Sequence, residues 1–515
     1  HFRAAGMMTE AVEWGIRAMD LYASAYRHQE VETWSEKLLE WVDGRDRKWL
    51  FQVLKRFEAS LAATGATGRR ENLLTRLLKL AEDPCCSGEL AWVLREYGGY
   101  HYITGNPGKA AAMYNRALAL ADRQGNLELQ SDILNRLGEI ACTSGKIQRA
   151  EKYYAMALDI AETAGSSNRA ASALICMGNL HLNRGKASEA LEHYRRAEGI
   201  TDSRQVRMQI TANMGMTLSI LERGDEALER FREALLESRE TGDRIAEGAI
   251  LGNMGILLQN RGSMDEALDS FEAALTIARE TGNRKGEGIV LGNMGILHNH
   301  QGRLIKAREC YSRSLELRRG SGNKRGQAVA LLNMGSLDLE LGSIRSARDC
   351  FRSALEISRE IMNPSDEAVA LGNLGQVYLR EGNLEDAENS ARDSVAISES
   401  TGARKNLASG LQTLGTVLLE KGDMEGARDS LNRSLELSRE IGNRCMECVT
   451  LGILGWMDLG ESHTESAVEK YRAARQTIEE LDLGRKDMER FIDLHRELVS
   501  MGVAGVPPGL PGSWS

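Results

Sequence analysis

Proline and aromatic residues are scarce in this 515-residue sequence. Pro occurs 6 times and Phe, Trp and Tyr make up 5% of the residues, whereas Gly occurs 52 times. The single large core of a globular enzyme usually contains more aromatic residues, so this composition favours thin layers of packed helices. The length, well above that of an ordinary domain, indicates several domains or a repeat array.

The sequence also lacks a positive net charge, a long apolar run and a signal peptide. The formal net charge is −9, which argues against a nucleic-acid partner because nucleic acids attract a basic face. No apolar run approaches the length of about 18 residues that spans a membrane, and no signal-peptide pattern is present. Scattered cysteines without a disulfide framework fit a reducing, cytoplasmic compartment.

A 40-residue repeat is the strongest pattern in the chain. Strings such as Leu251-Gly-Asn-Met-Gly255 recur at this interval, and an Ala follows each final Gly after 12 residues. One interval, between Gly178 and Gly215, is 37 residues instead. The Gly/Ala pair occurs ten times, as Gly98/Ala110, Gly138/Ala150, Gly178/Ala190, Gly215/Ala227, Gly255/Ala267, Gly295/Ala307, Gly335/Ala347, Gly375/Ala387, Gly415/Ala427 and Gly455/Ala467.

Each repeat predicts a first helix with clear start and stop signals. In the repeat that contains Gly255, this helix is expected over residues 244–260, with Asp243 as its N-cap. Gly262 follows the last helical residue, where a left-handed backbone conformation often ends a helix. No alternation of β-branched residues occurs anywhere, so strands are not expected.

A second helix follows in the same repeat and is expected to end near Glu280. Ser263 and Glu266 have the spacing of a capping box at its start. Ala267 and Phe271 begin a packing stripe at helical spacing. Gly255 and Ala267 are small, which predicts a close approach of two helix backbones. A repeat of this size cannot bury its apolar stripe alone and must stack on its neighbours.

These residues resemble the tetratricopeptide pattern, through the small residues Gly255, Ala267 and Ala274, the turn residue Gly262 and the aromatic Phe271. The resemblance implies an all-α fold, a right-handed α-α superhelical solenoid of helix hairpins. The 40-residue form is similar to the repeats of spindle-orientation Leu-Gly-Asn adaptors, kinesin light chains and bacterial signalling proteins. It implies binding of a protein or peptide ligand.

The repeat pattern also divides the chain. Residues 1–90 are expected to be a degenerate helical segment that starts within a repeat, and residues 91–482 to hold ten repeats. A capping helix is predicted over 483–502 and a flexible tail over 503–515. The amino-terminal segment is similar to the helical region after the nucleotide-binding module of signal-transduction ATPases and to an arm of some protein kinases. An alternative function is therefore a sensor or autoinhibitory arm, and dimerisation through an exposed end is a further hypothesis.

An Asn recurs on the face that would line the concave side of such a superhelix. In the related kinesin light chains and spindle adaptors, an Asn at the place of Asn253 holds the main chain of an extended peptide. An amide both donates and accepts, so a ladder of amides pairs with a strand backbone irrespective of its side chains. The alternative is that these amides brace neighbouring helices. The predicted peptide-binding residues are Asn213, Asn253, Asn293, Asn333 and Asn373, with Asn179, Asn183, Ile256, Asn260, Asn299, His300, Gln376 and Arg380 beside them.

Signals for metal or catalytic chemistry are weak. Cys445-Met-Glu-Cys448 is a single C-x-x-C without further ligands nearby, and is best interpreted as structural. His298 and His300 are two residues apart on a helix, so their rings should diverge. No phosphate-binding loop or nucleophile elbow is present. The sequence therefore predicts a binding protein without cofactor, metal or catalytic site.

Overall fold

The computed structural model describes residues 8–24, 27–42, 46–221, 223–481, 488–501, 503 and 506. All regular structure in these ranges is helical, as predicted, and includes no strand. The helices are α1 (Met8–Ser24), α2 (His28–Trp41), α3 (Arg47–Thr64), α4 (Thr67–Ala81), the short 3-10 helix η1 (Ser87–Glu89), α5 (Leu90–Ile103), α6 (Pro107–Arg123), α7 (Leu127–Thr143), α8 (Ile147–Thr163), α9 (Ser167–Asn183), α10 (Ala187–Ile200), α11 (Arg204–Ile220), α12 (Gly224–Thr241), α13 (Arg244–Asn260), α14 (Met264–Glu280), α15 (Arg284–His300), α16 (Leu304–Gly320), α17 (Lys324–Glu340), α18 (Ile344–Glu360), α19 (Pro364–Arg380), α20 (Leu384–Thr401), α21 (Arg404–Glu420), α22 (Met424–Glu440), α23 (Arg444–Gly460), α24 (Thr464–Leu481) and α25 (Glu489–Ser500).

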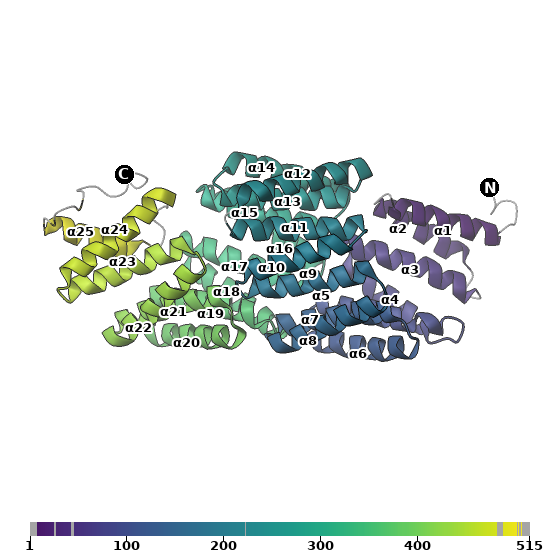
Figure 1. Cartoon of the computed structure of the whole chain (residues 1–515), viewed down its shortest axis with the longest axis horizontal. Helices are drawn as coiled ribbons and strands as arrows, with labels where there is room; N and C mark the ends of the chain where they lie inside the picture. Colours follow the sequence, from purple (N-terminus) through teal and green to yellow (C-terminus); the bar gives the residue numbers. More distant parts are fainter. Residues whose placement is uncertain are drawn as a thin grey trace. The chain divides into compact units, whose positions relative to one another are not determined.

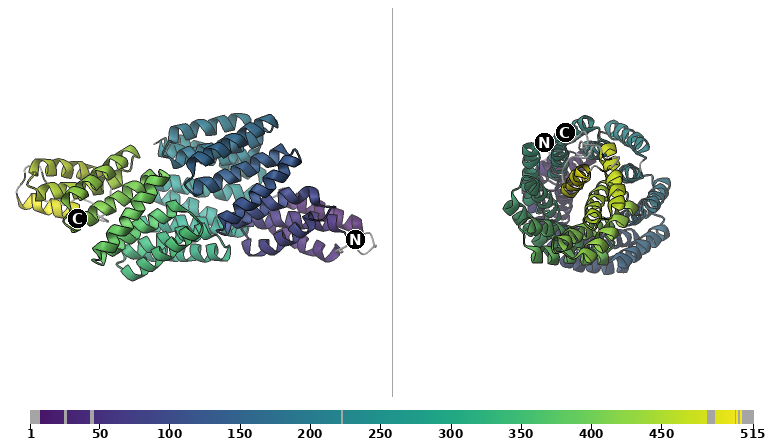
Figure 2. Two further views of the ribbon diagram at one scale, coloured as in Figure 1. Left: turned by 90° about the horizontal axis from the view of Figure 1, so that it is seen from below. Right: turned by 90° about the vertical axis from the view of Figure 1, so that its left-hand side faces the viewer.

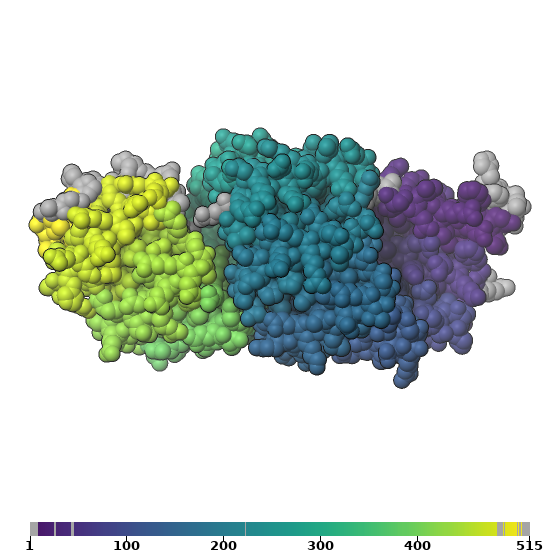
Figure 3. All heavy atoms as spheres, in the orientation of Figure 1, coloured from purple at the N-terminus to yellow at the C-terminus, as the bar shows by residue number. Residues whose placement is uncertain are grey.

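The chain forms two compact units. The first comprises residues 1–334 and 360–362, and the second residues 335–359 and 363–515. In both units, consecutive helices form antiparallel hairpins that stack side by side (Figure 1), and side chains fill the space between neighbouring helices (Figure 3). The helices α5 to α24 make ten such hairpins, one for each Gly/Ala pair of the sequence.

The helix boundaries predicted for the repeat around Gly255 are those of α13 and α14. The Asp243 carboxylate accepts a hydrogen bond from the Ala246 N–H at 3.0 Å, and Gly262 has the expected positive φ of 81°. The capping box is wrong. Ser263 occupies the N-cap of α14 without a side-chain cap, and its own N–H already donates to the Leu258 carbonyl at 3.0 Å.

A ring on the second helix explains the small residue on the first helix. A Cβ built at Gly255 would lie 2.6 Å from Cε1 of Phe271, which is too close for a real contact. The predicted reason, close approach of two backbones, is therefore wrong for this repeat. An aromatic ring lies 16 residues after the Gly, against it, in seven repeats: Gly98/Tyr114, Gly138/Tyr154, Gly178/Tyr194, Gly215/Phe231, Gly255/Phe271, Gly295/Tyr311 and Gly335/Phe351.

The next repeat departs from this arrangement. The residue 16 positions after Gly375 is Ala391, which has no ring. A Cβ at Gly375 would lie 3.3 Å from the Ala387 carbonyl oxygen and 3.2 Å from Thr413 Cγ2. Here the backbones do approach, because no ring separates the two helices.

The first helices of successive hairpins form a continuous layer in each unit. In the first unit each of α5, α7, α9, α11 and α13 contacts the next first helix, and in the second unit α19 contacts α21 and α21 contacts α23. No pair of successive second helices makes a contact of similar extent in the described ranges. Each stack therefore curves toward its first helices, which form its inner layer. Figure 2 shows the curvature of the stacked helices.

The 37-residue interval has a local cause. The helix α10 has 14 residues, whereas α8 in the preceding hairpin has 17. It ends at Ile200 and is followed by Thr201 in an extended conformation, and Ser203 caps α11 by accepting from the Val206 N–H at 3.4 Å. Three residues are thus missing from the end of one second helix, and the hairpin pattern continues unchanged after it.

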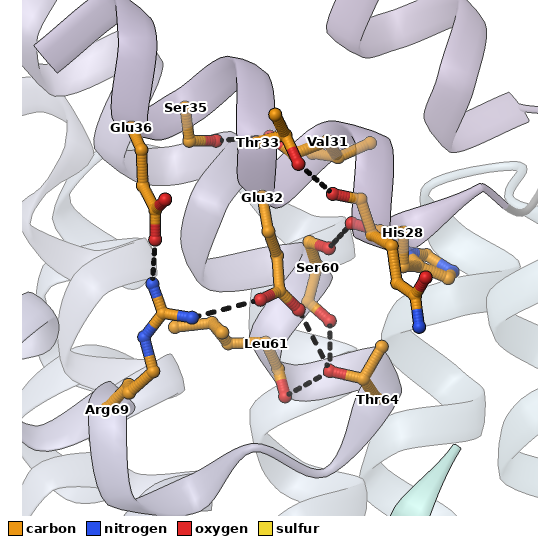
Figure 4. A network of polar contacts seen from close by, with 11 residues as sticks. His28, Val31, Glu32, Thr33, Ser35, Glu36, Ser60, Leu61, Thr64 and Arg69 are labelled. Atoms are coloured by element: carbon orange, nitrogen blue, oxygen red, sulfur yellow. Dashed lines mark hydrogen bonds and ion pairs between the residues drawn. The ribbon is translucent and has the colours of Figure 1, made fainter. Parts of the chain in front are cut away.

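Polar contacts join the amino-terminal helices α2, α3 and α4 (Figure 4). Ser60 Oγ donates to the His28 carbonyl at 2.9 Å, and Thr64 Oγ1 donates to Glu32 at 3.4 Å. Arg69 from α4 donates to Glu32 at 3.0 Å and to Glu36 at 2.5 Å. Burial raises the pKa of Glu32 above its ordinary value despite the nearby Arg69 guanidinium.

The first unit also touches itself across distant repeats. Gln29 Nε2 would lie 2.7 Å from a Cβ at Gly282, and Lys285 Cβ would lie 3.1 Å from a Cβ at Gly65. The amino-terminal helices therefore lie on the linker that precedes α15. Because residues more than 200 positions apart in sequence meet, the stack of the first unit completes a superhelical turn.

The last helix packs on the last hairpin of the second unit. Phe491 of α25 stacks on Tyr471 of α24 with ring centroids 5.1 Å apart. Met488, Phe491, Leu494 and Leu498 are at most 2% exposed. The tail predicted over 503–515 lies almost entirely outside the described residues, as do residues 1–7.

Candidate functional site

Three predicted asparagines occupy equivalent places on first helices of the first unit. Asn253 lies on α13, Asn293 on α15 and Asn333 on α17, and each is partly exposed. Among the residues that the structure describes, none forms a hydrogen bond with these three side-chain amides. Asn373 on α19 has the same exposure and the same lack of a described partner in the second unit.

Two other predicted asparagines bond to each other. Asn213 Nδ2 on α11 donates to Asn179 Oδ1 on α9 at 3.1 Å, and the Tyr194 hydroxyl donates to the same oxygen at 2.6 Å. These amides brace neighbouring helices, which was the alternative interpretation of the whole ladder. The sequence pattern alone does not distinguish this pair from Asn253 and Asn293.

The flanking residues of the first unit have mixed surroundings. Ile256 and Asn299 are partly exposed and Asn260, His300 and Asn183 are exposed. His300 Nδ1 lies 3.2 Å from Gln259 Nε2 of the preceding first helix. The Asn299 side-chain oxygen is buried and has no hydrogen-bond partner among the described residues, and Asn183 Nδ2 donates to Cys142 Sγ at 3.8 Å.

Charged residues replace the Asn in the earliest repeats. Glu96 stands at the equivalent place on α5 and pairs with its neighbour Arg95. Arg95 also lies 3.1 Å from Asp132 of α7, and Arg70 forms a buried pair with Glu58. Burial and the Glu96 carboxylate raise the pKa of Glu58 above its ordinary value. Each of these charged groups thus forms an ion pair within the protein.

A pocket of about 850 Å³ lies on the inner layer of the second unit. It is lined by α19, α21, α23 and α25, by Gly382 and Leu384 at the turn from α19 to α20, and by Asn443 in the linker that precedes α23. Gln376 and Arg380, both predicted from sequence, are among its residues. The others are Leu379, Gly382, Leu384, Ser409, Gln412, Thr413, Thr416, Glu420, Asn443, Cys445, Met446, Val449, Ile453, Arg490 and Asp493.

Polar side chains in this pocket are partly held by the protein. Gln376 Nε2 donates to Thr413 Oγ1 at 3.4 Å, and Gln412 Nε2 donates to Thr450 Oγ1 at 3.1 Å. The repeat could have predicted Thr416 and Glu420, since they stand 160 residues after Ile256 and Asn260. Arg490 and Asp493 carry no such signal, because α25 lies outside the repeats.

The weak metal motifs have structural surroundings. Cys448 is buried and donates from Sγ to the Ala474 carbonyl at 3.3 Å, while Cys445 is exposed. His298 is buried whereas His300 is exposed, and burial lowers the pKa of His298 below its ordinary value. In the described part of the chain, no three His, Cys, Asp or Glu side chains converge so that they could hold a metal ion.

The sequence comparison assigns the family. The model of the tetratricopeptide repeat matches residues 129–203, 207–280, 286–360, 326–400 and 366–440, more than half of the chain. The chain belongs to the tetratricopeptide repeat family. Proteins with tetratricopeptide repeats generally mediate protein–protein interaction. No curated protein has a significantly similar sequence. None of the described helices is both long and apolar enough to cross a bilayer.

Solved structures with a similar arrangement of helices include other tetratricopeptide repeat proteins. The Rap protein complexed with competence and sporulation factor is 15% identical, with a TM-score of 0.47 over 76% of this chain and 99% of its own. Cut9–Hcn1 of the APC/C is 12% identical, with a TM-score of 0.46 over 96% and 99%. The STAND protein with a tetratricopeptide repeat sensor, PH0952 from Pyrococcus horikoshii, is 18% identical, with a TM-score of 0.43 over 78% and 64%.

Proposed function

We propose that this tetratricopeptide repeat chain is a non-catalytic scaffold that binds an extended segment of a partner protein on its inner layer of first helices. The observation that carries the proposal is the set of partly exposed amides of Asn253, Asn293 and Asn333, which no described residue satisfies. Polar groups that form no hydrogen bond with the described residues can form one with a ligand.

The chemistry of these amides suits a peptide main chain. Each amide offers a donor and an acceptor, as does each peptide unit. The same place carries an amide in three successive repeats, and the first two of these amides lie on the contacting helices α13 and α15. A segment bound through its main chain leaves selection among partners to the residues beside the row. Ile256 and His300 are exposed there to different degrees and would contribute an apolar and a polar contact.

The pocket of the second unit supports the same proposal independently. It opens on the first helices α19, α21 and α23, and it has the size of established ligand pockets. Its lining combines apolar side chains with a few oriented amides and hydroxyls. The two surfaces are proposed as separate sites, and each can be tested without the other.

A displayed library of random 12-residue peptides, selected on the whole chain, provides a probe for the first unit. Replacing both Asn253 and Asn293 by Ala should weaken the binding of selected peptides by about tenfold or more, because each lost hydrogen bond costs about 0.5–1.5 kcal/mol. Asn115, which is exposed on the second helix α6, gives the matched control, and Asn115→Ala should leave the dissociation constants unchanged. Equal loss in the control, or none in the double variant, would contradict the proposal for this unit.

A further inference from the structure

The pocket of the second unit is bordered at one side by a helix outside the repeats. Arg490 and Asp493 of α25 line it together with Glu420, the last residue of α21. Arg490 forms an ion pair with Glu420. Its guanidinium also lies over the Trp456 ring, 4.4 Å from the ring centroid, and its Nη1 is 3.8 Å from Asp493. The aromatic ring and two carboxylates therefore hold one cation at the pocket wall.

The charged residues of the lining balance. The lining contains two positive residues, Arg380 and Arg490, and two negative residues, Glu420 and Asp493, so its formal charge is zero. An anionic ligand group at Arg490 would have to compete with Glu420 for the guanidinium. A cationic group would have to compete with Arg490 for the same carboxylate. Both exchanges break a contact that the free protein already makes, and so disfavour charged ligands at this wall.

In the rest of the lining, apolar and polar side chains come from different helices. Met446, Val449 and Ile453 follow one another on α23 at steps of 3 and 4, which puts three apolar side chains on one face. The neighbouring helix α21 contributes polar residues instead, among them Ser409 and Gln412. An extended chain could place its apolar side chains on α23 and its main-chain groups against α21.

We infer that this pocket selects an extended partner segment with uncharged, partly apolar side chains, and that Glu420 determines this selectivity by neutralising Arg490. The inference rests on the proposed function and adds the chemical class of the ligand for the second unit. Arg490 is the latent anion-binding group of the pocket. Removal of the Glu420 charge should expose it, because a guanidinium forms strong charge-assisted hydrogen bonds with carboxylates.

The test uses the same displayed library of random 12-residue peptides and the whole chain. Pocket-dependent peptides are those whose binding is lost when Val449 is replaced by Glu but kept when Asn432, exposed on the second helix α22, is replaced by Glu. In the wild type these peptides should be depleted of Asp, Glu, Lys and Arg relative to the library. With Glu420→Gln the selected peptides should become acidic, and a peptide with one added Glu should bind about tenfold more tightly than its uncharged parent.

Two further variants make the result specific. Glu440→Gln removes a carboxylate from an ion pair outside the pocket, with Arg404 at 2.8 Å, and should leave the selection uncharged. Glu420→Gln combined with Arg490→Gln should abolish the preference for acidic peptides. Pocket-dependent peptides that are charged in the wild type, or whose charge does not respond to Glu420→Gln, would overturn this inference alone. Absence of any pocket-dependent peptide would overturn the proposed function of the second unit and the inference with it.

Discussion

The ring of Phe271 occupies the space that a side chain at residue 255 would need, and Gly255 is small for that reason. An ideal Cβ at Gly255 lies 2.6 Å from Phe271 Cε1, 2.7 Å from Cδ1 and 2.9 Å from Cζ. Phe271 is fully buried between the two helices of its hairpin. The Gly and the ring thus form one packing unit, which the chain repeats with either Phe or Tyr.

The first prediction concerns this pair of Gly255 and Phe271. Gly255→Ala should destabilise the first unit by about 1–3 kcal/mol because the added methyl group overpacks the ring. Gly252 on the same helix is the control, since the nearest atom to a Cβ there is Val290 Cγ2 at 3.9 Å. Gly252→Ala should stabilise by up to about 1 kcal/mol through helix propensity. Urea unfolding followed by circular dichroism measures both, and equal effects of the two substitutions would contradict the packing account.

The second prediction separates asparagines that brace the fold from those available to a ligand. Asn179→Ala should lower the free energy of unfolding by about 1–3 kcal/mol, because it leaves the Tyr194 hydroxyl and the Asn213 amide without their shared acceptor. Asn253→Ala should change it by no more than about 0.5 kcal/mol. Thermal unfolding of the two variants tests this. A large loss in Asn253→Ala would show that this amide also has a structural role.

The third prediction follows from a buried carboxylate of the second unit. Asp458 accepts hydrogen bonds from Arg428 at 2.6 Å, Ser466 at 2.6 Å and Lys470 at 2.5 Å. Burial alone would raise the pKa of Asp458, but these three donors together hold it below its ordinary value. The resulting stabilisation is present above the ordinary pKa of Asp, about 3.9, and is lost as the pH falls through the lower folded value.

Asp458→Asn should therefore lower stability at pH 7 by about 3 kcal/mol and reduce the loss of stability on acidification. Asp429→Asn, at an exposed position of α22, is the control. Urea midpoints between pH 7 and pH 2.5 give the comparison. If the wild type and Asp458→Asn show parallel pH profiles, Asp458 is not the group responsible.

The fourth prediction concerns α25. Phe491 is 1% exposed and stacks on Tyr471, so Phe491→Ala should cost about 3–5 kcal/mol and detach α25 from the last hairpin. Ile492, which is only partly buried, gives the milder comparison. Hydrogen exchange should show faster exchange in α25 and α23 of Phe491→Ala while α19 stays protected. Unchanged protection of α25 would mean that other contacts hold this helix.

Much of the fold could be predicted because the sequence pattern of one helix hairpin occurs ten times. The limits of α13 and α14 and the turn at Gly262 follow from residues that act locally. The capping box was wrong because the Ser263 N–H is used by the preceding helix end, a competition that the local motif does not reveal. The role of Gly255 was misassigned because its neighbour Phe271 lies on the other helix of the hairpin.

The sequence predicted which asparagines take equivalent positions in the repeats, but not which of their side-chain amides form hydrogen bonds within the protein. The repeat places Asn213 and Asn253 at equivalent positions, yet the Asn213 amide is bonded to Asn179 and the Asn253 amide is not. Such differences depend on side chains from neighbouring repeats. Arg490 could not be anticipated at all, since it reaches the pocket from a helix without a repeat pattern.

Binding of a peptide main chain by the Asn253 and Asn293 amides can be observed in a crystal structure of the whole chain with the strongest peptide that depends on both residues. We expect an extended peptide along the first helices α13 and α15, with its main-chain N–H and C=O groups within hydrogen-bond distance of both amides. A peptide bound to the second helices, or one that contacts these residues only through its side chains, would contradict it.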